Sequence, residues 1–326
     1  MTKILITGCA GFIGYHLANA LMNKKKLKVF GIDNLNSYYD VDLKYSRLLE
    51  LKNKNKITKN FKFNKLDITK KKLLINYFKK NNFDCVINLA AQAGVRHSIE
   101  FPESYLDNNI IGFFNILEAS RKVKLKHLLF ASTSSVYGAN KKYPFNESDS
   151  TDNPESFYAA TKKSNETMAY AYSSIYNIPI TGLRFFTVYG PYGRPDMALF
   201  KFTELILKAR KIPLFNNGHH VRDFTYVDDV VTSIVKLINK PPKTKVPYDI
   251  FNVASANPLS LKKFLSLIER RLEKKARVSN KPFQKGDVYK TFGSIKKLIN
   301  KINYKPQTTI KKGIENFIDW YLKSFK

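Results

Sequence analysis

The segment FYAATKKSNE, residues 157–166, places a tyrosine and a lysine four residues apart. On a helix this spacing brings Tyr158 and Lys162 to one face. A free phenol, with a pKa of about 10, is a poor base at neutral pH, but a nearby ammonium group would stabilise the phenolate and lower that pKa. The pair could then move a proton to and from a substrate hydroxyl. The spacing alone is common, so a solvated lysine and a buried, hydrogen-bonded tyrosine remain open as alternatives.

A glycine-rich turn near the N-terminus predicts a dinucleotide site. In ILITGCAGFIGYHL, an apolar strand runs through Gly8, Gly11 and Gly14 into an amphipathic segment. Glycines let such a turn tighten and let its backbone approach a pyrophosphate at the positive helix N-terminus. Asp33 ends the next strand, KVFGID, where a carboxylate binds both ribose hydroxyls and repels a 2′-phosphate. The pattern therefore favours NAD over NADP, and Asp67 could reach adenine or merely cap a strand end.

The elements that must position these residues alternate along the first half of the chain. Buried strands are indicated by KILIT, KVFGID, FKFNKLD, CVINLA, HLLFAST and ITGLRFF, and helices by the periodic segments 12–23, 70–80, 103–121 and 156–176. This alternation predicts an α/β fold with a doubly wound parallel sheet of the Rossmann type. The stretch 52–60, KNKNKITKN, is interpreted as a solvated connection.

The alternation ends near residue 182, which indicates a smaller and partly discontinuous second domain. We expect residues 1–181 to form the NAD-binding domain, with 224–257 returning to it, because FTYVDDVV and DIFNVAS are apolar enough to rejoin the sheet. Residues 182–223 and 258–326, with helices at 198–210, 260–274 and 310–323, are expected to form the substrate-binding domain.

Composition favours the cytoplasm and argues against nucleic-acid and membrane partners. The chain has 326 residues and a formal charge of +30, which is spread along its length rather than gathered in one basic arm. Specific nucleic-acid binding is therefore not expected. There is neither an apolar run of membrane-spanning length nor a signal-peptide pattern, and two cysteines cannot build a disulfide framework. A cytoplasmic protein that binds no membrane and holds no metal is predicted.

Taken together, several motifs resemble those of the extended short-chain dehydrogenase/reductases. They are TGCAGFIG, NLAAQAGVRHS, ASTSSVYG, YAATK, LRFFTVYGPYGRPDMALFKF, RDFTYVDD and QKGDV. Within that superfamily, AAQAGVR and the long segment around Arg194 look most like UDP-glucuronate 4-epimerases. Tyr192 and His97 replace an expected tryptophan and tyrosine, and Thr133 replaces serine but keeps the hydroxyl.

The resemblance implies NAD-dependent epimerisation of a UDP-uronic acid at C4, converting UDP-glucuronate to UDP-galacturonate through a transient 4-ketone. It implies Tyr158, Lys162 and Thr133 as catalytic residues and a homodimer built on helices carrying residues 103–121 and 158–176. The implied cofactor contacts are Gly8, Gly11, Phe12, Ile13, Gly14, Asp33, Asn34, Asp67, Ile68, Leu89, Ala90, Ala91, Tyr158 and Lys162. The implied contacts of the UDP-sugar are Arg96, Ser132, Thr133, Ser134, Tyr158, Thr187, Arg194, Arg222 and Asp287.

Several of these roles have structural alternatives. Arg222 could clamp a diphosphate by its fork of donors, or pair with Asp223, Asp228 or Asp229. Asp287 could bind the uridine ribose or serve as a turn residue. Arg194 and Thr187 could hold a sugar carboxylate, or be an ordinary loop arginine and a packing residue.

Related activities also remain open. A UDP-glucose/UDP-galactose 4-epimerase and a UDP-glucuronate decarboxylase would share the first oxidation. A dehydratase needs an acid and a base, and Ser134 and Ser135 stand where that pair would be. A non-catalytic NAD sensor is opposed by the intact tyrosine, lysine and threonine set.

Overall fold

A seven-stranded parallel sheet forms the centre of the computed structural model, which describes residues 1–326 except 124, 285 and 326. Its strand order is β10-β6-β5-β4-β1-β2-β3, and every neighbouring pair is parallel. The strands are β1 (Thr2–Thr7), β2 (Leu27–Asp33), β3 (Phe61–Lys65), β4 (Cys85–Asn88), β5 (His127–Thr133), β6 (Ile180–Phe185) and β10 (Tyr248–Val253). The predicted doubly wound Rossmann fold is confirmed.

Apolar side chains bury both faces of this sheet. Successive side chains of a strand point to opposite faces. In β1, Ile4 and Ile6 join one hydrophobic cluster, which includes Leu17 of helix α1 (Phe12–Met22), whereas Leu5 joins a second with Phe113. The strands are therefore continuous apolar runs, which is why the sequence indicated them clearly.

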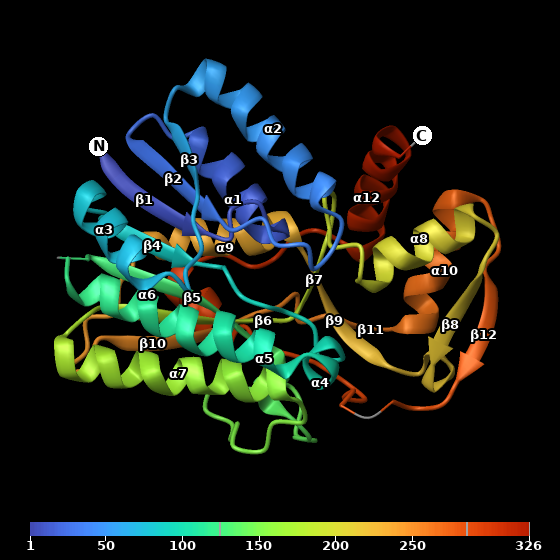
Figure 1. The fold of residues 1–326 in the computed structure, drawn as a ribbon. Helices are drawn as coiled ribbons and strands as arrows, with labels where there is room; N and C mark the ends of the chain where they lie inside the picture. The colour runs from blue at the N-terminus through green and yellow to red at the C-terminus, as the bar shows by residue number, and fades with distance from the viewer. Residues whose placement is uncertain (124, 285, 326) are drawn as a thin grey trace.

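Helices cover both faces (Figure 1). On the front face of the view lie α3 (Lys71–Asn81), α6 (Gly112–Arg121) and α7 (Phe157–Tyr176), and behind the sheet lie α1 and α9 (Val227–Ile238). α2 (Val41–Thr58) packs on α1 and β3. The segment before α6 comprises α4 (His97–Glu100), α5 (Pro102–Tyr105) and the π-helical η1 (Leu106–Ile111). Among the described residues, no helix has the length and apolar character needed to span a bilayer.

The second region lies beside the carboxyl ends of the strands, to the right in Figure 1. It contains a three-stranded sheet of β7 (Thr187–Tyr189), β9 (Val221–Tyr226) and β11 (Pro258–Ser260), and a parallel pair of β8 (Lys211–Phe215) and β12 (Arg277–Lys281). Its helices are α8 (Ala198–Leu207), α10 (Leu261–Leu272) and α12 (Ile310–Ser324), with a short 3-10 turn at η3 (Asn216–Gly218). The helix α11 (Lys296–Ile302) packs on β10 of the main sheet and on α9, and the 3-10 turn η2 (Ser134–Tyr137) follows β5 and contacts α7.

The structure corrects three expectations. Residues 52–58 are not a solvated connection but the last turns of α2, because Leu51 is buried and the lysines occupy the exposed side. Residues 224–226 do not rejoin the main sheet: they end β9, which pairs with β7 and β11, whereas β10 does rejoin it. The segment 227–231, predicted within that strand, begins helix α9. The predicted helix 103–121 is a nearly continuous run of α5, η1 and α6.

Candidate active site

The glycine turn between β1 and α1 is closed by backbone contacts that no side chain would permit. Gly8 has a φ of +69°, and a Cβ on Gly14 would lie 2.1 Å from the Gly8 carbonyl oxygen. Gly11 occupies the N-cap position of α1 without a side-chain cap. Backbone N–H groups at a helix N-terminus bind phosphate readily. The turn, followed by Phe12 and Ile13, therefore fits the pyrophosphate of the expected dinucleotide.

Asp33 lies next to this turn at the end of β2. Its side chain is only 8% exposed. One carboxylate oxygen, Oδ2, accepts a hydrogen bond from Ala10 N at 3.1 Å, and Oδ1 accepts one from Leu35 N at 2.8 Å. These bonds fix the carboxylate at the edge of the turn, where an adenosine ribose would lie.

The loop after β3 lies at the same edge of the sheet as Asp33. Asn34 Nδ2 donates to Asp67 Oδ2 at 3.0 Å, and Thr69 N donates to Asp67 Oδ1 at 2.8 Å. Burial raises the pKa of Asp67, but the hydrogen bonds from Asn34 and Thr69 outweigh it and hold that pKa below the usual value. Asp67 thus caps its own loop while lying near the predicted adenine position, with Ile68 following it.

The backbone after β4 approaches the glycine turn closely. A Cβ on Gly8 would lie 2.8 Å from Ala90 N, and Ala90 N donates to Thr7 Oγ1 at 3.1 Å. Leu89, Ala90 and Ala91 therefore border the same space as the glycines. The residues predicted to bind the cofactor from four separate strand ends meet at one edge of the sheet, and this donor set fits NAD.

Tyr158 and Lys162 lie one turn apart near the start of α7, as predicted. Ser98 Oγ accepts a hydrogen bond from Tyr158 N at 3.1 Å, which anchors this first turn. Lys162 Nζ donates to the carbonyl oxygen of Ala131 at 2.9 Å. Thr133 ends β5, where its hydroxyl donates to Ser135 Oγ at 3.2 Å, and it lies near enough to Tyr158 to lower the pKa of that phenol. The structure thus brings the three predicted catalytic side chains together.

Burial and charge act in opposite directions on this set. Burial raises the pKa of Tyr158, while the Arg194 guanidinium and the Thr133 hydroxyl lower it. The charge of Arg194, which the sequence did not link to Tyr158, thus acts on this phenol, and the lowering expected from Lys162 stays a prediction. Burial lowers the pKa of Lys162 to about 8, although the charge of Glu166 opposes the shift.

Ser132 does not face the catalytic set. Its hydroxyl donates to Glu166 Oε1 at 2.6 Å, and the side chain is 2% exposed. Glu166 is in turn paired with Arg184 at 2.8 Å inside the protein. The predicted substrate role of Ser132 is therefore not supported, because alternation along β5 turns it away from Thr133. Ser134, which begins η2, remains half-buried beside the site.

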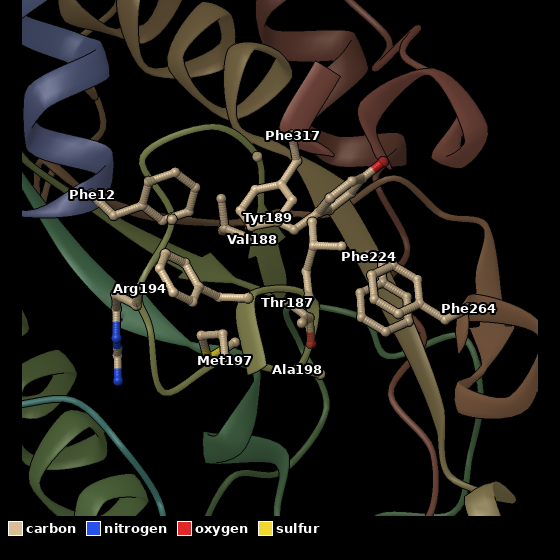
Figure 2. A pocket seen from close by; sticks show the side chains of 14 residues that line it. Phe12, Thr187, Val188, Tyr189, Arg194, Met197, Ala198, Phe224, Phe264 and Phe317 are labelled. Atoms are coloured by element: carbon tan, nitrogen blue, oxygen red, sulfur yellow. The ribbon is translucent and has the colours of Figure 1, made fainter. Parts of the chain in front are cut away.

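Thr187 and Arg194 belong to the second region, and the charge of Arg194 reaches Tyr158. Both line an apolar pocket with Phe12, Met197 and Phe317, among others. Figure 2 shows the Arg194 guanidinium directed away from those rings, so that its charged end lies outside the apolar group. Arg194 pairs with Asp196, which is two residues further along the chain.

Arg96, Arg222 and Asp287 form a separate charged group. Arg96 Nη2 lies 3.0 Å from Asp287 Oδ2. Burial and the charge of Arg96 both lower the pKa of Arg222, whereas the charge of Asp287 raises it. The three groups therefore lie close enough to interact electrostatically. Among the described residues no ion pair joins Arg222 to an aspartate of its own segment, because Asp223 accepts instead from Ser255 and Gly293.

Sequence reasoning missed Asp196, Tyr38 and Arg47. Asp196 stands in the quoted GRPDM motif, and its spacing from Arg194 could have revealed an ion pair. Tyr38 and Arg47 carry no local signal, because their partners in residues 190–197 are far away along the chain.

Comparison with known proteins agrees with this geometry. The chain matches the family described as GDP-mannose 4,6 dehydratase over residues 5–317. It is 48% identical to "Protein CapI" of Staphylococcus aureus, over 99% of each chain. It is 42% identical to the UDP-glucuronate 4-epimerase of Thermodesulfobacterium geofontis, over 98% of this chain and 96% of the relative.

A solved structure is similar over its whole length. The UDP-glucuronic acid 4-epimerase of Bacillus cereus, crystallised with UDP-glucuronic acid and NAD, superposes with a TM-score of 0.91 at 32% identity, covering 99% of this chain and 100% of that one. The chain therefore belongs to the GDP-mannose 4,6 dehydratase family of extended short-chain dehydrogenase/reductases.

Proposed function

We propose that this protein is an NAD-dependent UDP-glucuronate 4-epimerase, which interconverts UDP-glucuronate and UDP-galacturonate through a transient 4-ketone. The observation that carries the proposal is the position of Tyr158, Lys162 and Thr133 beside Arg194, in a fold whose strand ends fit NAD. Relatives and a solved structure with that activity in their names support it.

Oxidation is needed because the C4–H bond of the sugar is not acidic enough to lose a proton directly. When bound, NAD accepts a hydride from C4 and later returns it. Tyr158, as the phenolate, takes the proton of the O4 hydroxyl, and Thr133 hydrogen-bonds O4 and relays that proton. Lys162 holds the end of β5 through Ala131. We assign it also to bind the nicotinamide ribose.

Inversion follows when the keto-sugar turns its other face toward the cofactor. Tyr158, now a phenol, returns its proton to O4 as the hydride is restored to C4. The hydrogen bond from Tyr158 N to Ser98 Oγ anchors the first turn of α7 and so helps to keep the proton donor in place while the sugar moves. Since NAD is regenerated in every turnover, we expect it to stay bound.

The carboxylate of a uronate needs protection during this step. The ketone at C4 is β to the C5 carboxylate, and such acids lose CO₂ when the bond to the carboxylate stands perpendicular to the carbonyl plane. We assign Arg194, Thr187 and Ser134 to hold that bond near the plane. A guanidinium fork can fix both position and orientation of a carboxylate.

The remaining charged group suits the nucleotide end of the substrate. Arg222 and Arg96 offer cationic donors for a diphosphate, and Asp287 can accept hydrogen bonds from the uridine ribose. In this assignment the residues before 182, with α9 and β10, bind the cofactor, and the second region binds UDP.

Product analysis tests the proposal against its rivals. Protein reconstituted with NAD is incubated separately with UDP-glucuronate, UDP-glucose and UDP-GlcNAc, and the anomeric protons are followed by NMR. We expect UDP-galacturonate from UDP-glucuronate, faster than any conversion of the neutral sugars. Faster turnover of UDP-glucose, or UDP-pentose as the main product, would contradict the proposal.

We further propose that the enzyme is a cytoplasmic homodimer whose product serves polysaccharide synthesis. Large apolar side chains are exposed along η1 and α7, notably Leu106, Ile111, Ile175 and Tyr176. A second copy that packs these helices against its own would bury these side chains. Light scattering on the purified protein tests the dimer.

The cytoplasmic location rests on a separate observation. Both cysteines are free and buried, in keeping with a reducing compartment.

A further inference from the structure

The carboxylate of Asp196 forms a bidentate contact with one edge of the Arg194 guanidinium. Arg194 Nε donates to Asp196 Oδ1 at 3.0 Å, and Nη2 donates to Oδ2 at 2.5 Å. Both side chains are largely buried, with 20% and 29% of their surface exposed. A guanidinium carries five N–H donors. The bidentate contact uses two of them, and no hydrogen bond joins Nη1 to any residue that the structure describes, so this edge is available to a second carboxylate.

Tyr38 also holds Asp196, at the same carboxylate oxygen that accepts from Arg194 Nη2. Its hydroxyl donates to Asp196 Oδ2 at 3.2 Å, and the Arg194 guanidinium lies 5.7 Å above its ring. The close approach of Tyr38 depends on Gly94, where a Cβ would lie 2.7 Å from the Tyr38 hydroxyl oxygen. Tyr38 belongs to the loop that follows Asp33, so a cofactor-binding loop also supports the arginine.

Arg47 also connects the loop after Asp33 with the segment that precedes Arg194, through hydrogen bonds to both. It is fully buried and donates from Nη1 to the Ala10 carbonyl at 2.8 Å and to the Tyr39 hydroxyl at 2.7 Å. Its Nη2 donates to the carbonyl of Tyr192 at 2.7 Å. Through Arg47, the segment that carries Arg194 and Asp196 is therefore hydrogen-bonded to the glycine turn.

We propose that Asp196, held by Tyr38, is a positioning residue that presents the free edge of Arg194 to the C5 carboxylate of the sugar and so confers selectivity for uronates. The inference rests on the proposed function and deepens it. An unrestrained arginine would still attract a carboxylate by charge, but it would not fix the plane of that group. Bidentate contacts on both sides of the guanidinium leave it one orientation.

This division of roles predicts a particular kinetic signature. Asp196→Asn removes the negative charge that partly offsets Arg194, so attraction for a uronate is kept or increased. The same change releases the guanidinium from its bidentate contact, so the carboxylate is held less precisely. We expect kcat for UDP-glucuronate to fall by about tenfold or more, with KM unchanged or lower, because small misplacements cost up to about 10²-fold.

The test measures kcat and KM of the NAD-loaded enzyme for UDP-glucuronate and UDP-glucose, together with UDP-pentose formation. In Asp196→Asn we expect UDP-pentose to appear and the UDP-glucose rate to stay within about threefold. Tyr38→Phe, which removes one hydrogen bond from Asp196, should show a smaller change of the same kind. Asp319→Asn, in the exposed pair of Asp319 of α12 with Arg271 of α10, is the matched control and should resemble the wild type.

Two results would overturn the inference. Unchanged activity on both substrates in Asp196→Asn would remove Asp196 from selectivity, and an equal loss on both substrates would indicate a purely structural role. Bound NAD and melting temperature are measured for each variant to identify such a loss. Wild-type protein inactive on UDP-glucuronate would overturn the proposed function and this inference with it, whereas an active wild type with unchanged variants would overturn the inference alone.

Discussion

The ammonium group of Lys162 donates a hydrogen bond to the main-chain carbonyl of Ala131, over 2.9 Å. This bond joins α7 to β5, one helical turn from Tyr158 and two residues before Thr133. The three side chains proposed as catalytic are therefore held by one helix and one strand end of the central fold. Rigid elements of this kind suit a reaction in which the sugar moves while the catalytic groups do not.

Removal of the Tyr158 hydroxyl should stop proton transfer without unfolding the protein. We expect Tyr158→Phe to lower kcat by at least about 10²–10⁴-fold, the usual effect of losing general acid–base catalysis. Steady-state kinetics measures the loss, and the NAD content should stay at the wild-type level. Tyr170→Phe, on the exposed side of the same helix, is the matched control. A near-normal rate in Tyr158→Phe would exclude this residue from the mechanism.

The charge of Arg194 should shift the pH dependence of kcat, because it changes the pKa of Tyr158. A cation lowers the pKa of a nearby phenol, so removing Arg194 should raise the pKa of Tyr158. In Arg194→Gln the rise of kcat with pH should therefore move to higher pH, in addition to an overall loss of activity on UDP-glucuronate. Arg194→Lys keeps the charge and should move the profile less. Identical profiles for the two variants would show that the charge of Arg194 does not reach Tyr158.

Asp33 should decide between NAD and NADP. We expect Asp33→Ala to weaken NAD binding by about 10- to 100-fold, since charge-assisted hydrogen bonds contribute about 1.5–3 kcal/mol. Discrimination against NADP should also relax, because the repelling carboxylate is gone. Calorimetric titration of cofactor-free protein measures both affinities, with the exposed Asp42→Ala as control. Wild-type protein that prefers NADP would contradict the role of Asp33.

The buried pair of Arg184 and Glu166 should contribute to stability rather than to chemistry. Arg184 donates to both oxygens of Glu166, at 2.9 and 2.8 Å, and so connects β6 with α7. We expect Arg184→Met to lower the free energy of unfolding by about 3–5 kcal/mol, because it removes the bidentate ion-pair partner of the buried Glu166. The double variant with Glu166→Leu should recover part of that loss in urea denaturation. Additive losses would indicate that the two side chains are not coupled.

The sequence was most informative where local spacing determines geometry. Tyr158 and Lys162 are four residues apart on a periodic segment, so their alignment follows from the helix itself. The buried parallel strands were equally evident, because both of their faces are apolar. The helix α2 was not predicted, because exposed lysines and asparagines hide its periodicity and much of its stability comes from packing on α1.

Contacts between distant segments could not be predicted in this way. Whether an apolar strand joins the main sheet depends on the path of the chain, so β9 and β10 looked alike in sequence although only β10 joins it. The Tyr38–Asp196 hydrogen bond spans 158 positions of sequence and arises only when two loops meet. Ser132 and Thr133 are adjacent in sequence, yet only the strand register shows that they face different partners.

The fate of the hydrogen at C4 tests the central claim most directly. UDP-glucuronate carrying deuterium at C4 is converted by the NAD-loaded enzyme in ordinary water, and the product is examined by NMR and mass spectrometry. A hydride that leaves and returns within the site should keep its deuterium, so we expect UDP-galacturonate fully labelled at C4. Loss of the label to solvent would indicate proton abstraction at carbon instead, and would contradict oxidation and reduction by bound NAD with Tyr158 as the acid and base.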